Sequence, residues 1–141
     1  MFDFGCHRLE VLLNCLGPVR GVASVVTNVF FQRSVEDTAV AVLNFERGAT
    51  ATVAVSHAVL EPRDTLEIFG SAGSIRVENL NKGDLRLTGA SERAEHHPPA
   101  PNLHQPLVDD FVDAVRAGRD PAVTGEIGRE VARLEELIYR Q

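Results

Sequence analysis

The stretch that decides the fold is residues 3–17, which read Asp3-Phe4-Gly5-Cys6-His7-Arg8-Leu9-Glu10-Val11-Leu12-Leu13-Asn14-Cys15-Leu16-Gly17. Its apolar residues recur at the i, i+3, i+4, i+7 spacing of an amphipathic helix and are Leu9, Leu12, Leu13 and Leu16. Gly17 followed by Pro18 is a stop signal, because proline cannot continue a helix. We expect Asp3 to be the N-cap, since its carboxylate can accept a backbone N–H one turn into the helix.

Asp3 and His7 make the start of this helix a candidate catalytic site. The two residues are four positions apart, so their side chains project from one side of the helix. A carboxylate held beside an imidazole can accept and donate protons in acid–base catalysis. A capping Asp followed by an incidental His is the alternative, and the spacing alone leaves both interpretations open.

Length and composition narrow the class of protein. A chain of 141 residues is expected to form a single domain, residues 1–141, with a real core. The net charge of −6 argues against binding to nucleic acid, which needs a basic surface. No apolar run reaches the ~20 residues of a membrane-spanning helix, so no membrane partner is expected. Nothing at the N-terminus reads as a signal peptide, and the expected compartment is the cytoplasm.

Strand-like runs follow the first helix. The expected strands are residues 19–31, 37–46, 49–58, 65–69, 74–78 and 85–88. Arg47-Gly48 is expected to join the second and third of them as a two-residue hairpin loop. Residues 89–101 are rich in proline and are expected to form an exposed loop.

Two helices are expected after the strands. One carries an apolar face that ends before Gly118 and consists of Leu107, Val108, Phe111, Val112 and Val115. The last helix is expected to begin at a Thr124 cap. Strands followed by helices indicate an α+β fold, with a mostly antiparallel, open-faced sheet and the helices on one face.

The expected hairpin has unusual faces. No charged residue lies between Asp37 and Glu46, or between Arg47 and Glu61. A sheet face open to water usually alternates apolar with charged or polar residues. Small uncharged residues on both faces therefore favour a sheet covered on both sides, by helices on one and by a second copy of the chain on the other. A threonine-rich face that tolerates solvent is the alternative.

Several segments together resemble a known family. They follow the Asp-x-Gly-x-His segment in this order: Val35-Glu36-Asp37-Thr38-Ala39, Leu43-Asn44-Phe45-Glu46-Arg47-Gly48, Leu66-Glu67-Ile68-Phe69-Gly70-Ser71-Ala72-Gly73-Ser74, Asp109-Asp110-Phe111-Val112-Asp113-Ala114 and Pro121-Ala122-Val123-Thr124-Gly125-Glu126. In this order they resemble the C-terminal domain of the Gfo/Idh/MocA oxidoreductases, the family of glucose-fructose oxidoreductase and inositol dehydrogenase. The resemblance covers nearly the whole chain.

The resemblance implies a role in a hydride-transfer reaction. Family members move a hydride between a sugar or polyol carbon and NAD or NADP, which a preceding Rossmann domain binds. In the family motif the histidine that matches His7 is the proposed acid/base, and the aspartate that matches Asp3 binds substrate or orients that histidine. Family members also associate through the open sheet, which implies a homo-oligomer.

The cofactor domain itself is not expected in this chain. No G-x-G-x-x-G segment stands between a strand and a helix, and Lys82 is the only lysine. We therefore expect no cofactor to bind to this chain alone. The chain is expected to be a C-terminal domain by itself, from a truncated gene, cut out of a longer protein, or half of a split enzyme whose Rossmann domain is supplied in trans.

The histidines outside the first helix are weaker site candidates than His7. His104, at the start of a helix after a flexible loop, is a weaker candidate for substrate binding, whereas His96 and His97 are expected to be solvated. No spacing among the Cys and His residues matches a zinc site, so no metal is expected. The alternative function is a stand-alone dimeric binding or scaffold module that has lost catalysis, and the sequence leaves open whether the chain is an enzyme.

Overall fold

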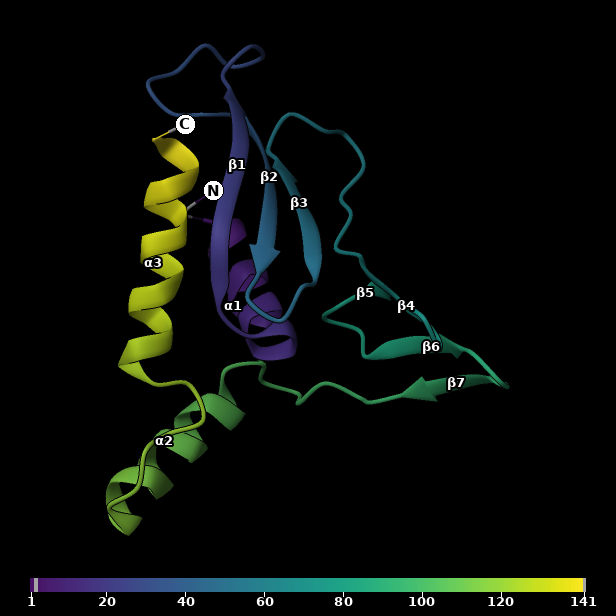
Figure 1. Ribbon diagram of the computed structural model, residues 1–141. Coiled ribbons are helices and arrows are strands. Elements are labelled where there is room, and N and C mark those ends of the chain that lie inside the picture. The colour runs from purple at the N-terminus through teal and green to yellow at the C-terminus, as the bar shows by residue number, and fades with distance from the viewer. Residues whose placement is uncertain (2, 141) are drawn as a thin grey trace. The chain divides into compact units, whose positions relative to one another are not determined.

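The structure is a computed structural model that describes Met1 and residues 3–140 (Figure 1). Its elements are, in order, α1 (Gly5–Leu16), β1 (Val19–Thr27), β2 (Thr38–Phe45), β3 (Thr50–Ser56), β4 (Leu66–Gly70), β5 (Gly73–Asn79), β6 (Asp84–Thr88), β7 (Glu92–His96), α2 (Gln105–Ala117) and α3 (Gly125–Tyr139). The chain divides into two compact units. The first unit is Met1–Val59 with Val123–Gln141, and the second unit is Leu60–Ala122.

The predicted α+β class is confirmed. The strands pair antiparallel throughout, but they form two sheets, whereas the sequence predicted one. The first unit holds the sheet β1-β2-β3 with α1 and α3, and the second unit holds the sheet β4-β5-β6-β7 with α2.

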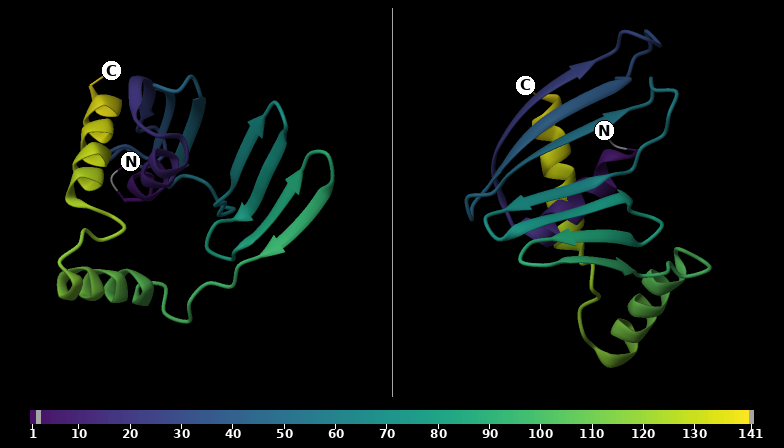
Figure 2. Two further views of the ribbon diagram at one scale, coloured as in Figure 1. Left: turned by 60° about the horizontal axis from the view of Figure 1, so that its bottom comes forward. Right: turned by 90° about the vertical axis from the view of Figure 1, so that its right-hand side faces the viewer.

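In the first unit, α1 and α3 lie on the same face of the β1-β2-β3 sheet (Figures 1 and 2). The Ser24 hydroxyl of β1 donates a hydrogen bond to the carbonyl oxygen of Ile138 in α3 at 2.6 Å, which holds the helix on that face. The core between sheet and helices consists mainly of Leu9, Leu12, Ala39, Ala41, Leu43, Phe45, Val53, Val131, Leu134 and Ile138. Alternate residues of β2 point into this core, which is the period of two that a strand imposes.

The opposite face of this sheet is open and carries no charge. Its cross-strand rows are Thr27-Thr38-Ser56, Val25-Val40-Ala54, Ala23-Val42-Thr52 and Gly21-Asn44-Thr50. Val25 is 64% exposed, and Val40 and Val42 are 37% and 38% exposed. We call this surface the open face.

The β2–β3 hairpin has a three-residue loop, so the prediction of a two-residue loop was wrong. The Phe45 N–H donates to the Ala49 carbonyl at 2.9 Å, and the Gly48 N–H donates to the Phe45 carbonyl at 3.0 Å. Gly48 has φ 91°, the left-handed conformation that three-residue hairpins place at their last loop position. A two-residue loop of the tightest type would force Arg47 into the left-handed conformation. In the three-residue loop only Gly48 takes that conformation.

The C-terminal end of α1 matches the prediction from sequence, and the N-terminal end does not. Gly17 ends the helix as predicted, with φ 87° and its N–H donating to the Leu13 carbonyl at 2.9 Å. Asp3 is not the N-cap, because Phe4 occupies that position with a helical backbone and no side chain caps the helix. The carbonyl of Met1 instead accepts the Gly5 N–H at 2.7 Å. Gly5 lets the Met1 side chain pack against the helix start, since a Cβ at this position would lie 1.8 Å from the Met1 sulfur and would displace that flexible side chain.

The start of α3 follows the prediction. The Thr124 side chain caps the helix by accepting the Ile127 N–H at 3.5 Å. Val131, Leu134 and Ile138 are buried against the sheet of the first unit.

The second unit contains a strand that the sequence did not predict. β7 lies within the expected loop 89–101 and pairs with β6. Its sequence, Glu92-Arg93-Ala94-Glu95-His96, is charged rather than alternating, so periodicity could not reveal it. Charged residues are typical of an edge strand, and cross-strand pairs such as Arg86–Glu92 at 2.9 Å stabilise it.

The helix of the second unit, α2, is present as predicted and ends at Gly118, which has φ 63°. Its apolar stripe is exposed and consists of Leu107, Val108, Phe111, Val112 and Val115. Among the described residues no helix has the length and apolar character needed to cross a membrane.

Candidate functional site

A pocket of about 390 Å³ lies in the first unit, beside the start of α1. Asp3 from the segment before α1 and His57 from the end of β3 line it, together with Met1, Phe31, Arg33, Val35, Glu36 and Tyr139. The volume falls within the ~300–1,000 Å³ range of small-molecule sites. Several of the lining side chains are ionisable or aromatic, so we take this pocket as the candidate functional site.

Asp3 faces His57 in this pocket, not His7. The Asp3 Oδ2 lies 3.8 Å from His57 Nε2, and both side chains remain accessible, at 73% and 45% exposure. The ring of Phe4 lies beside the imidazole, with ring centroids 4.7 Å apart. The backbone N–H of His57 donates to the Asp37 carbonyl at 2.8 Å, which extends the β2–β3 pairing by one residue and fixes the backbone at His57.

The loop between β1 and β2 forms another wall of the pocket, and Asp37 holds it in place. The Asp37 Oδ2 accepts the backbone N–H groups of Phe30 at 2.6 Å and Phe31 at 3.2 Å. Desolvation by burial raises the pKa of Asp37, but these N–H groups outweigh it, so the pKa lies below its ordinary value. Asp37 is therefore a structural anion of the loop.

Glu36, on the same loop, is engaged by two donors. Its carboxylate accepts hydrogen bonds from the Tyr139 hydroxyl and from the Met1 nitrogen, and that nitrogen lies 3.0 Å from the Tyr139 hydroxyl oxygen. Desolvation by burial raises the pKa of Glu36, but these donors outweigh it and bring the pKa below its ordinary value. A carboxylate held in this way is a poor proton acceptor.

The three site residues predicted from sequence lie in different places. Asp3 lines the pocket. The His7 side chain is exposed in the first turn of α1 and forms no hydrogen bond or ion pair with a described residue. His104 lies in the second unit, directly before α2, where its N–H donates to Asn102 Oδ1 at 3.0 Å. The roles assigned to all three stay predictions.

His57 and Arg33 were missed as site residues by reasoning from sequence. His57 is remote from Asp3 along the chain, and only the pairing of β2 with β3 brings it to the pocket. Its one sequence signal was its position directly after an uncharged strand. Arg33 carried no signal beyond its place in a polar turn.

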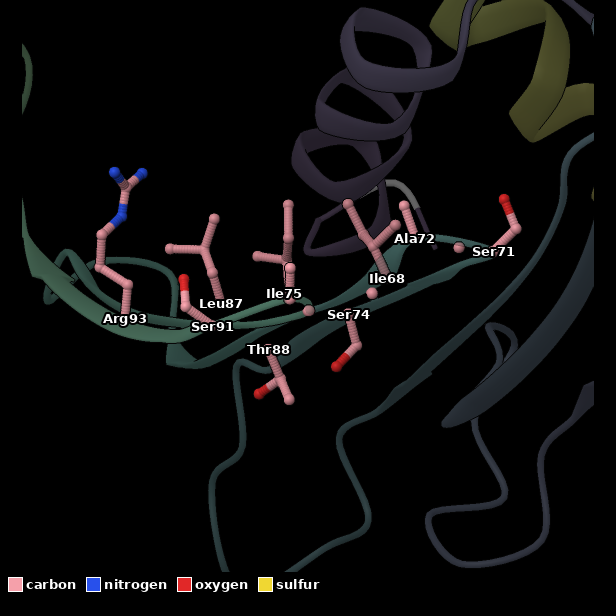
Figure 3. Close-up of a pocket in the computed structure, with 13 residues that line it drawn as sticks. Ile68, Ser71, Ala72, Ser74, Ile75, Leu87, Thr88, Ser91 and Arg93 are labelled. Carbon is pink, nitrogen blue, oxygen red and sulfur yellow. The ribbon is translucent and has the colours of Figure 1, made fainter.

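A second pocket, of about 580 Å³, lies over the sheet of the second unit (Figure 3). Its floor is the cross-strand row Ile68-Ile75-Leu87, which continues to Arg93, and these side chains point to one side of the sheet. Arg93 is paired with Glu95, and no carboxylate or imidazole lines the pocket. This pocket therefore lacks groups for acid–base chemistry.

His96 and His97, expected to be solvated, are exposed, and each contacts a carboxylate. His96 Nδ1 lies 2.6 Å from Asp84 Oδ1, and His97 Nε2 lies 2.8 Å from Glu95 Oε2. His96 belongs to β7, whereas a loop had been predicted there. Within the described part of the chain, no group of three His, Cys, Asp or Glu side chains is placed to hold a metal ion.

The fold and the site define an α+β domain with a polar pocket at the start of its first helix. The chain belongs to the family described as the GFO/IDH/MocA C-terminal domain, which matches residues 1–76. The family resemblance inferred from the sequence is thereby confirmed. A comparison with curated proteins found no match.

Solved structures share this fold over almost the whole chain. UDP-N-acetylglucosamine 3-dehydrogenase from Acidithiobacillus ferrooxidans is 24% identical with a TM-score of 0.85, over 98% of this chain and 45% of that one. An oxidoreductase from Agrobacterium radiobacter, in complex with NAD⁺, L-tartaric acid and magnesium, is 23% identical with a TM-score of 0.85, over 98% and 45%. Aldose-aldose oxidoreductase from Caulobacter crescentus, complexed with glycerol, is 26% identical with a TM-score of 0.83, over 98% and 43%. The chain thus spans less than half the length of these proteins.

Proposed function

We propose that this chain is the substrate-binding and self-association domain of an NAD(P)-dependent oxidoreductase that acts on a sugar or polyol. The observation that carries the proposal is the family's Asp-x-Gly-x-His motif at the start of α1, with Asp3 lining a ligand-sized pocket. The similar structures support the substrate class, since their names include a sugar-nucleotide dehydrogenase and an aldose-aldose oxidoreductase.

The chain's own residues would supply binding and proton transfer. When a substrate hydroxyl is oxidised, its proton must pass to a base within hydrogen-bond reach. His7 is the proposed acceptor. Asp3, which faces His57 rather than His7, is proposed to bind the substrate hydroxyl. The exposure of both side chains leaves them free to contact a substrate.

A dinucleotide does not fit among the described residues. Its phosphates need a glycine-rich turn between a strand and the N-terminus of a helix. The one strand-to-helix connection in the described chain runs from β7 to α2 through residues 97–104, which contain no glycine. The hydride acceptor would therefore be held by a separate nucleotide-binding domain, on a longer protein or in trans.

The open face supports the proposed self-association. It is an uncharged, valine- and threonine-lined surface, and sheets pack face to face at about 10 Å through such surfaces. A two-fold pair would bury the same rows from both copies. The stand-alone scaffold is the second candidate function. The observation that favours it is that no residue of the open face lines the pocket, so the chain could self-associate without binding a substrate.

Joining the chain to a nucleotide-binding domain separates the two candidates. The fusion would use that domain from a similar dehydrogenase, and NAD(P)H formation would be followed by absorbance with a panel of aldoses and polyols. We expect hydride transfer from the fusion and none from either part alone. A fusion that binds the dinucleotide, dimerises and turns over no member of the panel would favour the scaffold.

A further inference from the structure

The charged groups around the Asp3–His57 pocket point to one class of substrate. We propose that the pocket takes a small polyhydroxylated anion, such as a sugar acid or a sugar phosphate, and that Arg33 holds the anionic group. This inference rests on the proposed function of the domain and names the substrate class for the same site.

Arg33 is held in place but its charge is not neutralised. The Asn28 side chain accepts the Arg33 N–H at 3.1 Å and also donates to the Arg33 carbonyl, so the backbone at this position is fixed. The guanidinium carbon lies 4.9 Å from the centroid of the Phe31 ring, a cation–π arrangement. No described carboxylate forms an ion pair with Arg33.

The position of this cation is informative because the protein is acidic. The chain carries 20 acidic and 14 basic residues, so a guanidinium that lines a pocket without a carboxylate partner does not follow from a general excess of basic residues. A guanidinium presents a rigid fork of donors that matches carboxylate and phosphate oxygens. The stacking on Phe31 leaves those donors available.

The carboxylates of the pocket do not compete for Arg33. Glu36 is already engaged by the Tyr139 hydroxyl and the Met1 nitrogen. Asp3 faces His57 at 3.8 Å, and this pair can bind hydroxyl groups as acceptor and donor. The pocket therefore offers a cationic group for an anion and a separate polar pair for hydroxyls.

Size and the aromatic wall agree with this chemistry. A volume of about 390 Å³ suits a ligand of monosaccharide size. Phe31 also lines the pocket, and its ring offers an apolar surface for the C–H face of a sugar.

The test is an NMR titration of the ¹⁵N-labelled chain with D-glucuronate, glucose 6-phosphate, glucose and inorganic phosphate. We expect the two anionic sugars to shift the signals of Phe31, Arg33 and His57, with dissociation constants at least about tenfold lower than that of glucose. Comparing the dissociation constants of D-glucuronate and glucose 6-phosphate shows whether the pocket prefers a carboxylate or a phosphate. Arg33→Gln should remove the difference between glucuronate and glucose, and the control Arg129→Gln, on the exposed side of α3, should keep it.

Three results would overturn the proposal. Equal affinity for glucose and glucuronate would remove the role of the anion while leaving a sugar-binding domain intact. Binding of inorganic phosphate as tightly as glucose 6-phosphate would show an adventitious anion site. The absence of any NMR chemical-shift change at Phe31, Arg33 and His57 with any of the sugars would also refute the proposal. The proposed function of the domain would then be tested separately, by the activity of the fusion protein.

Discussion

Thr52 and Val53 are neighbours on β3 that point to opposite faces of the sheet, so one substitution at each position tests the open face. Thr52 is exposed and lies opposite Val42 on the open face, whereas Val53 is 6% exposed and points into the core. We predict that Thr52→Glu abolishes self-association of a folded protein, and that Val53→Glu unfolds the protein.

The magnitudes follow from what each new carboxylate would contact. In a sheet-on-sheet dimer, Glu at position 52 would be desolvated beside Val42 without a cationic partner on the face. Burying an unpaired charge costs several kcal/mol, and about 4 kcal/mol weakens a dimer roughly 10³-fold. A two-fold interface contains each substitution twice, which increases the effect. Glu at position 53 would place the same charge in the core and should cost more than about 4 kcal/mol of folding stability.

Sedimentation velocity at high micromolar concentration measures the first effect, and urea unfolding measures the second. Thr52→Ser is the matched control and should remain a dimer. The reasoning would be refuted by a parent protein that sediments as a monomer at these concentrations, or by a Thr52→Glu variant that dimerises as tightly as the parent.

Three further substitutions, two of them with an exposed control, test the packing and electrostatics of the first unit by urea unfolding. Leu134→Ala removes a fully buried side chain and should cost about 2–5 kcal/mol, whereas Arg129→Ala, on the exposed side of α3, should change stability by less than about 0.5 kcal/mol. Asp37→Asn should lower the free energy of unfolding at pH 7. The difference from the parent should shrink as pH falls below about 4, because the lowered pKa of Asp37 means that the carboxyl stabilises the fold only while it is ionised. A difference in unfolding free energy that does not depend on pH would contradict this. Desolvation by burial raises the pKa of Glu135, so its ionisation opposes folding as pH rises. Glu135→Gln should therefore stabilise the protein at pH 7 and not at pH 4, and exposed Glu136→Gln should show no such gain.

Much of the fold could be predicted from sequence because the signals were local. The leucine spacing and Gly17 defined α1, and the Thr124 cap defined the start of α3. Arg47-Gly48 indicated the hairpin between the second and third strands, although its loop proved one residue longer. In each case a few neighbouring residues determine the backbone conformation.

The parts that the sequence could not predict depend on contacts between distant residues. β7 is a charged edge strand whose pairing with β6 is supported by cross-strand ion pairs rather than by an apolar period. The capping prediction failed for a local reason instead: α1 begins at Gly5, so Phe4 is the N-cap and Asp3 lies one residue outside it. His57 and Arg33 reach the pocket through strand pairing and a loop held by Asp37, which no single motif encodes.

The most direct test of the central claim is a comparison of kcat/KM among variants of the fusion protein, with the best substrate of the panel. If the start of α1 is the catalytic element, His7→Ala should lower the rate by roughly 10²–10⁴-fold, the loss expected for a general base, and Asp3→Asn should lower it less. His97→Ala, an exposed residue of the second unit, is the control and should stay within about twofold of the parent. A His7→Ala variant within a few-fold of the parent, beside a His97→Ala variant without activity, would contradict the account.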